Sequence, residues 1–235
     1  MNPAGLTYGG NGYEGILLID KPLGLSSFGV VARIRRLLGI KKVGHGGTLD
    51  PLATGLLVVL VGNATKRCGE FLSDGKVYRA CICLGSTTIG DDREGHVIRR
   101  EPHEHIDETH IRKILPTFLG TQLQVPPVFS AKKINGVPSY KKARAGGCIC
   151  PPPQEITIHR MDFCRYQAPL LELEIECSKG TYVRAIARDM GIKLGCCAHL
   201  HGLRRIQSGK FSIQDAIPLA GESGDVILQS KYPGF

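Results

Sequence analysis

The sequence predicts a mixed α+β architecture built around one sheet. The run Leu56–Val61 is unbroken apolar, the pattern of a strand covered on both faces. The segment Leu171–Cys177 alternates strictly between apolar and acidic side chains, as a strand with one buried face does. Two segments with helical periodicity, ending at Gly39 and Gly195, are interspersed among the strands. This order of elements is typical of α+β folds.

The first half of the chain begins with a short apolar strand, Ile16–Ile19, which ends in a turn at Asp20-Lys21-Pro22. Ser26 or Ser27 can cap a helix that Gly39 stops. The apolar face of that helix carries Val31, Ile34 and Leu38. A glycine-rich loop, Val43–Thr54, then leads into the buried strand 56–61.

The second half continues with a strand at Val77–Leu84 and a helix at Asp107–Leu119. Ile156–Tyr166 is expected to pair with the alternating strand 171–177. Thr181 can cap a helix with Val183, Ile186, Met190 and Leu194 on one stripe, and Arg204–Phe211 suggests a last strand. The segment Val125–Pro153 is rich in Pro, Lys and Gly, with only a short helical candidate at Pro138–Arg144.

The formal net charge of +9 favours a polyanionic partner, because basic side chains that neutralise phosphates release condensed counterions. Small basic groups recur in at least six places, which indicates a broad phosphate-facing surface rather than a basic tail. No segment is apolar over the ~18 residues that a membrane span needs, and residues 1–14 read as a loose leader without a signal-peptide core. We therefore expect a cytoplasmic protein.

The nine cysteines are odd in number and irregular in spacing, with no C-x-x-C. Cys196-Cys197-Ala198-His199-Leu200-His201 is the most metal-like stretch, but a second ligand pair at suitable spacing is missing. Free thiols and no metal are therefore expected. The H-x-E and P-C-x-x-C pattern of zinc-dependent base deaminases is also absent from the sequence.

The stretch from Gly44 to Gly55 is the most informative in the chain. Three glycines in four positions allow positive φ and close approach of a ligand, and Pro51 biases Asp50 toward an extended conformation. The result is one carboxylate on a stiffened loop before a buried strand. A simple turn in which Asp50 bonds local amides is the structural alternative. Both phosphate-binding glycine motifs, G-x-x-x-x-G-K-S/T and G-x-G-x-x-G, are missing, which argues against nucleotide hydrolysis.

Five stretches, in order, resemble the motifs of the TruB family of tRNA pseudouridine-55 synthases. The loop reads "GHGGTLDPLATGLL" and closely resembles the family's active-site motif. The other four are "GILLIDKPLGLSS", "KVYRACICLG", "CSKGTYVRAIARDMG" and "LRRIQSGKF". The resemblance covers residues 15–215 and implies the pseudouridine synthase fold, with a central, mixed, mostly antiparallel sheet flanked by helices and loops.

By this resemblance Asp50 is the catalytic aspartate and Arg184 its ionic partner. Tyr78 is expected to stack on the target base. The remaining substrate-binding residues that the resemblance implies are His45, Tyr182, Leu203 and Lys21. No cofactor is implied. Where many family members have Thr after the motif histidine this chain has Gly46, which we expect to loosen the loop around His45.

The resemblance also implies a domain organisation and a partner. Residues 15–215 form the catalytic domain, with a T-loop-binding insertion near 125–153 whose expected RNA contacts are Lys132, Lys141, Lys142 and Arg144. Residues 216–235 are expected to be a short tail without a complete PUA domain. The expected partner is the T-arm of tRNA, bound by a monomer without an obligatory protein partner. A non-catalytic tRNA chaperone and a synthase for another T-loop-like RNA remain alternatives.

Overall fold

The computed structural model of the protein describes residues 6–9, 12–129, 133–134, 137–138 and 151–219. The chain divides into two compact units, and the expected catalytic domain over residues 15–215 stays a prediction. Unit 1 contains residues 1–77 and 204–235, and unit 2 contains residues 78–203. Strands β5 (Lys76–Leu84) and β13 (Ala198–Ser208) have residues in both units.

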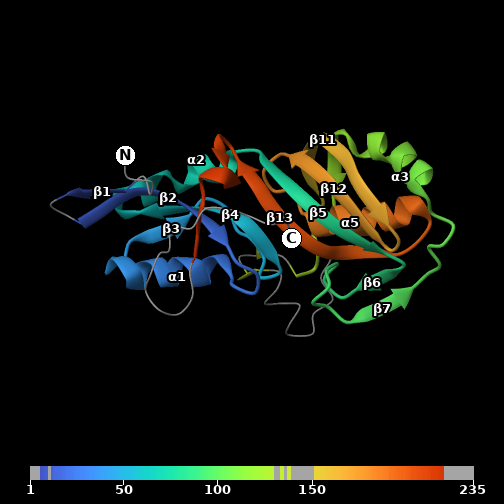
Figure 1. The fold of residues 1–235 in the computed structure, drawn as a ribbon, viewed down its shortest axis with the longest axis horizontal. Coiled ribbons are helices and arrows are strands. Elements are labelled where there is room, and N and C mark those ends of the chain that lie inside the picture. The colour runs from blue at the N-terminus through green and yellow to red at the C-terminus, as the bar shows by residue number, and fades with distance from the viewer. Residues whose placement is uncertain (1–5, 10–11, 130–132, 135–136, 139–150, 220–235) are drawn as a thin grey trace. The chain divides into compact units, whose positions relative to one another are not determined.

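Unit 1 is a small sheet with one long helix (Figure 1). Besides its parts of β5 and β13, unit 1 contains β1 (Leu6–Gly9), β2 (Gly12–Lys21), α1 (Ser27–Leu38), β3 (Val43–His45), β4 (Ala53–Val61), η1 (Gly62–Arg67), α2 (Cys68–Ser73), β14 (Phe211–Ser212), η3 (Ile213–Asp215) and β15 (Ile217–Pro218). The strand order is β1-β2-β4-β13, and β3 also pairs with β4. β15 runs parallel to β2 while β1, β3 and β4 pair antiparallel, so the sheet is mixed, as expected.

Helix α1 confirms its sequence signals. The side chain of Ser26 accepts a hydrogen bond from the amide of Gly29, and Gly39 ends the helix in the left-handed conformation. Its buried residues Val30, Val31 and Ile34 pack with apolar side chains of β2 and β4. Ser26 is therefore the N-cap of α1, and the hydroxyl of Ser27 bonds the backbone of Leu49 instead.

Unit 2 is built on the strand order β13-β5-β12-β11-β8. Besides its parts of β5 and β13, unit 2 contains β6 (Ser86–Thr88), β7 (Val97–Arg100), α3 (Glu108–Ile114), η2 (Leu115–Phe118), β8 (Gly120–Gln124), β9 (Lys133–Ile134), β10 (Val137–Pro138), β11 (Gln154–Gln167), β12 (Leu170–Cys177) and α5 (Val183–Leu194). From Leu171 to Cys177 the apolar side chains of β12 are buried and the glutamates are half-buried, which confirms the alternation. The predicted helix at 107–119 is α3, capped by Asp107, followed by the tighter turn η2. The expected α+β architecture is thus confirmed.

Four local expectations need correction. Residues 6–9, part of the expected loose leader, form strand β1 and pair with β2. The cap of α5 is Tyr182 rather than Thr181, whose hydroxyl instead donates to the Ser178 carbonyl at 2.9 Å. The expected strand 204–211 begins earlier, at Ala198, and ends in a hairpin to β14. Of the helical candidate 138–144, Pro138 belongs to β10 and the rest lies outside the described residues.

Candidate active site

Asp50 lies in the connection between β3 and β4, which are antiparallel neighbours in unit 1. Asp50 is half-buried, whereas Leu49 and Leu52 are buried in the core. The amide of Ala53 donates to the Asp50 carbonyl oxygen at 3.0 Å and closes a turn across Pro51. The aspartate therefore sits at a turn whose flanking leucines anchor it to the interior.

The backbone on both sides of Asp50 is held by residues near the start of α1. The buried hydroxyl of Ser27 accepts from the Leu49 amide at 2.8 Å and lies 3.0 Å from the Leu49 carbonyl oxygen, to which it donates. The amide of Gly24 donates to the Pro51 carbonyl at 2.8 Å. These bonds connect segments more than twenty residues apart, and they fix the loop on the helix side.

Lys21, expected to bind substrate, has a fully buried side chain. Its ammonium group donates to the carbonyl oxygens of Leu25 at 2.6 Å, Pro22 at 2.9 Å and Pro51 at 3.5 Å. A buried ammonium needs such acceptors because it has lost its hydration. In this structure the Lys21 amine braces the loop backbone, and its contact with substrate stays a prediction.

Arg205 holds the other end of the loop, although with Arg204 it was one of the basic groups expected on a phosphate-facing surface. Its side chain is enclosed, with 1% of the residue exposed. The guanidinium donates to the carbonyls of Leu56 at 2.7 Å, Gly47 at 3.1 Å and Thr48 at 3.4 Å. The carbonyl groups of residues 47, 48, 49 and 51 thus all receive side-chain donors from elsewhere in unit 1.

His45 lies at the end of β3, at the entrance to this loop. Burial, and secondly the charge of Arg205, lower the pKa of the imidazole from its ordinary value. The Gly47 amide donates to Nδ1 at 3.4 Å, which requires an unprotonated Nδ1. The imidazole is therefore neutral around pH 7, and its place in substrate binding stays a prediction.

Gly46 tightens the structure where we expected it to loosen the loop. Its amide donates to the Val58 carbonyl at 2.8 Å. A β-carbon at this position would lie 2.5 Å from the Cβ of Phe71, so a larger residue requires the aromatic side chain to move. Glycine allows the end of β3 to pack directly against α2.

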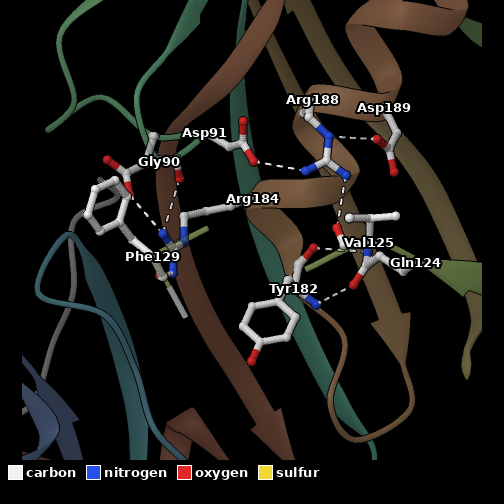
Figure 2. Close-up of polar contacts among 10 residues, drawn as sticks. Gly90, Asp91, Gln124, Val125, Phe129, Tyr182, Arg184, Arg188 and Asp189 are labelled. Atoms are coloured by element: carbon white, nitrogen blue, oxygen red, sulfur yellow. Dashed lines mark hydrogen bonds and ion pairs between the residues drawn. The ribbon is translucent and has the colours of Figure 1, made fainter. Parts of the chain in front are cut away.

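In unit 2, Arg184 on α5 is almost fully buried and holds two loops together (Figure 2). It donates to the carbonyls of Gly90 at 3.1 Å and Phe129 at 2.9 Å, and it lies 3.4 Å from the carboxylate of Asp92. Arginine suits this buried position because its guanidinium group stays charged when it loses its water. Asp50 belongs to unit 1 and Arg184 to unit 2, and their expected pairing stays a prediction.

Tyr182 precedes α5 and is held through its backbone (Figure 2). The buried side chain of Gln124 accepts from the Tyr182 amide at 2.9 Å and donates to the Tyr182 carbonyl at 3.1 Å. These two hydrogen bonds fix the backbone of Tyr182, the residue that immediately precedes the helix. The half-buried Tyr182 ring is thereby fixed at its base.

One turn farther along α5, Arg188 ties the same loops to the helix (Figure 2). It forms ion pairs with Asp91 at 3.0 Å and Asp189 at 2.9 Å, and it donates to the Val125 carbonyl at 3.0 Å. Burial raises the pKa of the Asp91 carboxyl, and Arg188 partly offsets that effect. Gly90 to Asp92, Val125 and Phe129 are therefore positioned by two arginines of one helix.

The remaining predicted site residues have simple placements. Tyr78 is buried on β5, on the face that carries Ala80 and Ile82, and Leu203 is half-buried on β13. The predicted RNA contacts lie outside the described residues; they are Lys132, Lys141, Lys142 and Arg144.

Other classes of site find little support in the part of the chain that the structure describes. No three His, Cys, Asp or Glu side chains gather there in a way that could hold a metal ion. In the metal-like stretch, Cys197 donates to the Glu101 carboxylate and Nδ1 of His199 lies 3.0 Å from the Ser86 carbonyl oxygen. None of the described helices is long and apolar enough to cross a membrane.

Two family profiles together match residues 35–221 of the chain. The profile of the "TruB family pseudouridylate synthase (N terminal domain)" covers residues 35–183, and that of the "tRNA pseudouridylate synthase B C-terminal domain" covers residues 184–221. The chain belongs to the TruB family. The Asp50 loop and Arg184 fall within these TruB family regions.

Relatives in the TruB family are 44–46% identical to this chain over the matched regions. A protein of Syntrophotalea carbinolica named "tRNA pseudouridine synthase B" is 46% identical over 88% of this chain and 67% of its own length. One of Opitutus terrae with the same name is 44% identical over 88% of this chain and 86% of its own. The solved structure titled "Crystal Structure of a Cbf5-Nop10-Gar1 Complex" has a chain that superposes with a TM-score of 0.69 at 28% identity. That match covers 87% of this chain and 52% of the solved chain, so this chain spans about half the length of that protein.

Proposed function

We propose that the chain isomerises uridine to pseudouridine in tRNA, at the T-loop uridine at position 55, with Asp50 as the catalytic carboxylate. The observation that carries the proposal is the Asp50 turn itself. Its carboxylate-bearing residue is half-buried, and the backbone around it is bonded to Ser27, Lys21 and Arg205. Relatives named "tRNA pseudouridine synthase B" support tRNA as the substrate.

The reaction breaks the bond between C1′ of the ribose and N1 of uracil, turns the base, and joins C1′ to C5. The C5 proton leaves and N1 takes up a proton, so the atoms balance without a redox partner or a group donor. A carboxylate suits this chemistry because it can attack carbon as a nucleophile or remove a proton as a base. Both roles require Asp50 to be ionised.

The other predicted site residues serve this requirement. Arg184 is proposed to stabilise the Asp50 carboxylate, since a guanidinium stays charged when it is desolvated. The target base must leave its stack, so Tyr78 is proposed to stack on the flipped base, a contact worth about 1–3 kcal/mol. His45, Tyr182, Leu203 and Lys21 are proposed to line the pocket or to fill the place that the base leaves.

Affinity for the T-arm is proposed to come from basic side chains of the insertion near 125–153, namely Lys132, Lys141, Lys142 and Arg144. Exposed cations of unit 1 add to the phosphate-facing charge, among them Lys41, Lys42 and Lys66. We also propose a monomer without an obligatory protein partner. We propose a cytoplasmic location, whose reducing conditions favour free thiols, and the cysteines that the structure describes are free.

The decisive experiment incubates purified protein with unmodified tRNA transcript and maps pseudouridine by carbodiimide-blocked primer extension. We expect a single stop at the T-loop uridine, absent with Asp50→Asn, while tRNA binding is retained. Asp215→Asn is the matched control, because Asp215 is an exposed acid in the turn η3. It should modify tRNA at the wild-type rate.

The remaining outcomes separate the alternatives. Tight tRNA binding without any stop contradicts the proposed activity and favours a chaperone. If the stop occurs only in another hairpin RNA with a T-loop shape, the protein has a different RNA substrate but carries out the same reaction. Loss of binding in Asp50→Asn means that Asp50 has a structural role in the turn.

A further inference from the structure

Arg205 is one of the largest side chains that the protein encloses completely. A buried guanidinium loses the solvation of its five N–H donors, and an uncompensated buried charge is strongly destabilising. Its neighbour Arg204 shows the ordinary solution to this problem on the same strand. Arg204 is partly exposed and pairs with the carboxylate of Asp20 at 2.7 and 3.0 Å.

Arg205 is compensated differently. All three of its hydrogen-bond acceptors are backbone carbonyl oxygens: that of Leu56 in β4, and those of Gly47 and Thr48 in the Asp50 loop. The guanidinium is planar, so one rigid fork sets the position of two loop carbonyls relative to the strand that follows the loop. Thr48 precedes Asp50 by two residues.

The charge of Arg205 also acts on the loop. Its acceptors are neutral, so the positive charge is not cancelled by a bonded carboxylate. After burial, this charge is the second cause of the lowered pKa of His45. The imidazole is therefore an internal reporter of whether the guanidinium is in place.

We propose that Arg205 is a positioning residue of the reaction, which holds the backbone of Gly47 and Thr48 so that the Asp50 carboxylate meets the reacting carbon. The inference rests on the proposed catalytic role of Asp50. Arg205 acts through the loop and makes no contact with the RNA. Its removal therefore lowers kcat and leaves KM for tRNA largely unchanged.

The test compares Arg205→Met, Arg205→Lys and Arg205→Ala with the wild type in single-turnover and steady-state assays. We expect kcat to fall by about tenfold to a hundredfold in Arg205→Met, because displacement of a reacting group by about 1 Å has that effect. KM should stay within about twofold. Arg205→Lys keeps the charge without the fork and should recover only part of the rate. Guanidinium ion at low millimolar concentration should partly rescue Arg205→Ala, and equal concentrations of sodium chloride should not.

A stability control separates positioning from simple destabilisation. Val31→Ala truncates a buried side chain that packs between α1 and the sheet of unit 1, among apolar residues of β2 and β4. At temperatures well below both melting transitions it should keep the wild-type kcat. If Arg205→Met has the kcat of Val31→Ala, Arg205 is only a structural residue and the proposal is overturned.

The titration of His45 tests the same placement without any RNA. Its C–H proton resonances, followed against pH by NMR, should give a higher pKa in Arg205→Met than in the wild type. Arg205→Lys should give an intermediate value. An unchanged His45 pKa overturns the proposal. If wild-type protein fails to modify tRNA, the proposed function fails, while this titration still decides whether Arg205 acts on the loop.

Discussion

Ser27→Ala is the substitution that most directly tests whether the Asp50 turn is held from inside the protein. The change removes one hydroxyl and leaves the buried amide and carbonyl of Leu49 without the partner that bonds both. Each buried polar group left unpaired costs about 1–3 kcal/mol, so two cost about 2–6 kcal/mol. Because neighbouring effects are not additive and water can enter, we expect the lower half of that range, near 3 kcal/mol.

The assay is urea denaturation together with the rate of pseudouridine formation. A loss of about 3 kcal/mol corresponds to a fall in Tm of roughly 6–12 °C for a chain of this size. Ser26→Ala is the matched control, because Ser26 caps α1 through one exposed bond to the Gly29 amide. It should cost about 1 kcal/mol and leave kcat unchanged. Equal stabilities and equal rates for the two variants refute the reasoning.

Three further predictions concern single groups. Gly46→Ala should lower the free energy of unfolding by about 1–3 kcal/mol, because the new methyl group overpacks against Phe71. Gly69→Ala is the control and should not lower it, because a β-carbon there meets open space. The midpoints of urea unfolding of the two variants measure the difference. Because the folded pKa of His45 is lowered, the unfolded chain takes up a proton first as pH falls below about 6.5, and stability is lost there. His45→Gln should remove that part of the pH dependence of Tm, and an unchanged slope contradicts it. Gln124→Leu should accelerate exchange of the Tyr182 amide, while Gln124→Glu, which keeps the acceptor, should protect it in NMR exchange experiments.

Local sequence signals predict the elements whose stability depends on residues close by in the chain. The Ser26 cap and the Gly39 stop define α1 within a few residues, and the alternation of 171–177 defines β12. The expected Thr181 cap was wrong because the Thr181 hydroxyl donates to the Ser178 carbonyl, while Gln124, 58 residues from Tyr182, bonds the backbone of Tyr182 before the helix. A hydrogen bond from so distant a side chain leaves no local signature in the sequence.

The side chains that bond the backbone of the Asp50 loop could not be predicted from the local sequence for the same reason. Ser27 is 22 residues from Leu49, and Arg205 is 158 residues from Gly47. One signal was available: alternation along β2 places Lys21 on the face of Leu17 and Ile19, which are buried. A lysine on that face must find acceptors inside the protein. The expectation that Lys21 binds substrate came from its motif and stays a prediction.

The glycines of the Asp50 loop are best understood together with these braces. Ordering a residue costs about 1–2 kcal/mol in backbone entropy, and glycine loses more than other residues. A glycine-rich loop that had to find its shape alone would therefore hold Asp50 poorly. Here Gly46 lets the chain pack against Phe71, and Gly55 passes so close to the backbone of Arg205 that a β-carbon would clash. The close approach brings the loop carbonyls within reach of Ser27, Lys21 and Arg205, whose hydrogen bonds offset the entropy. The glycines make this loop rigid because they let the interior bind its backbone directly, and that rigidity is what a catalytic carboxylate requires.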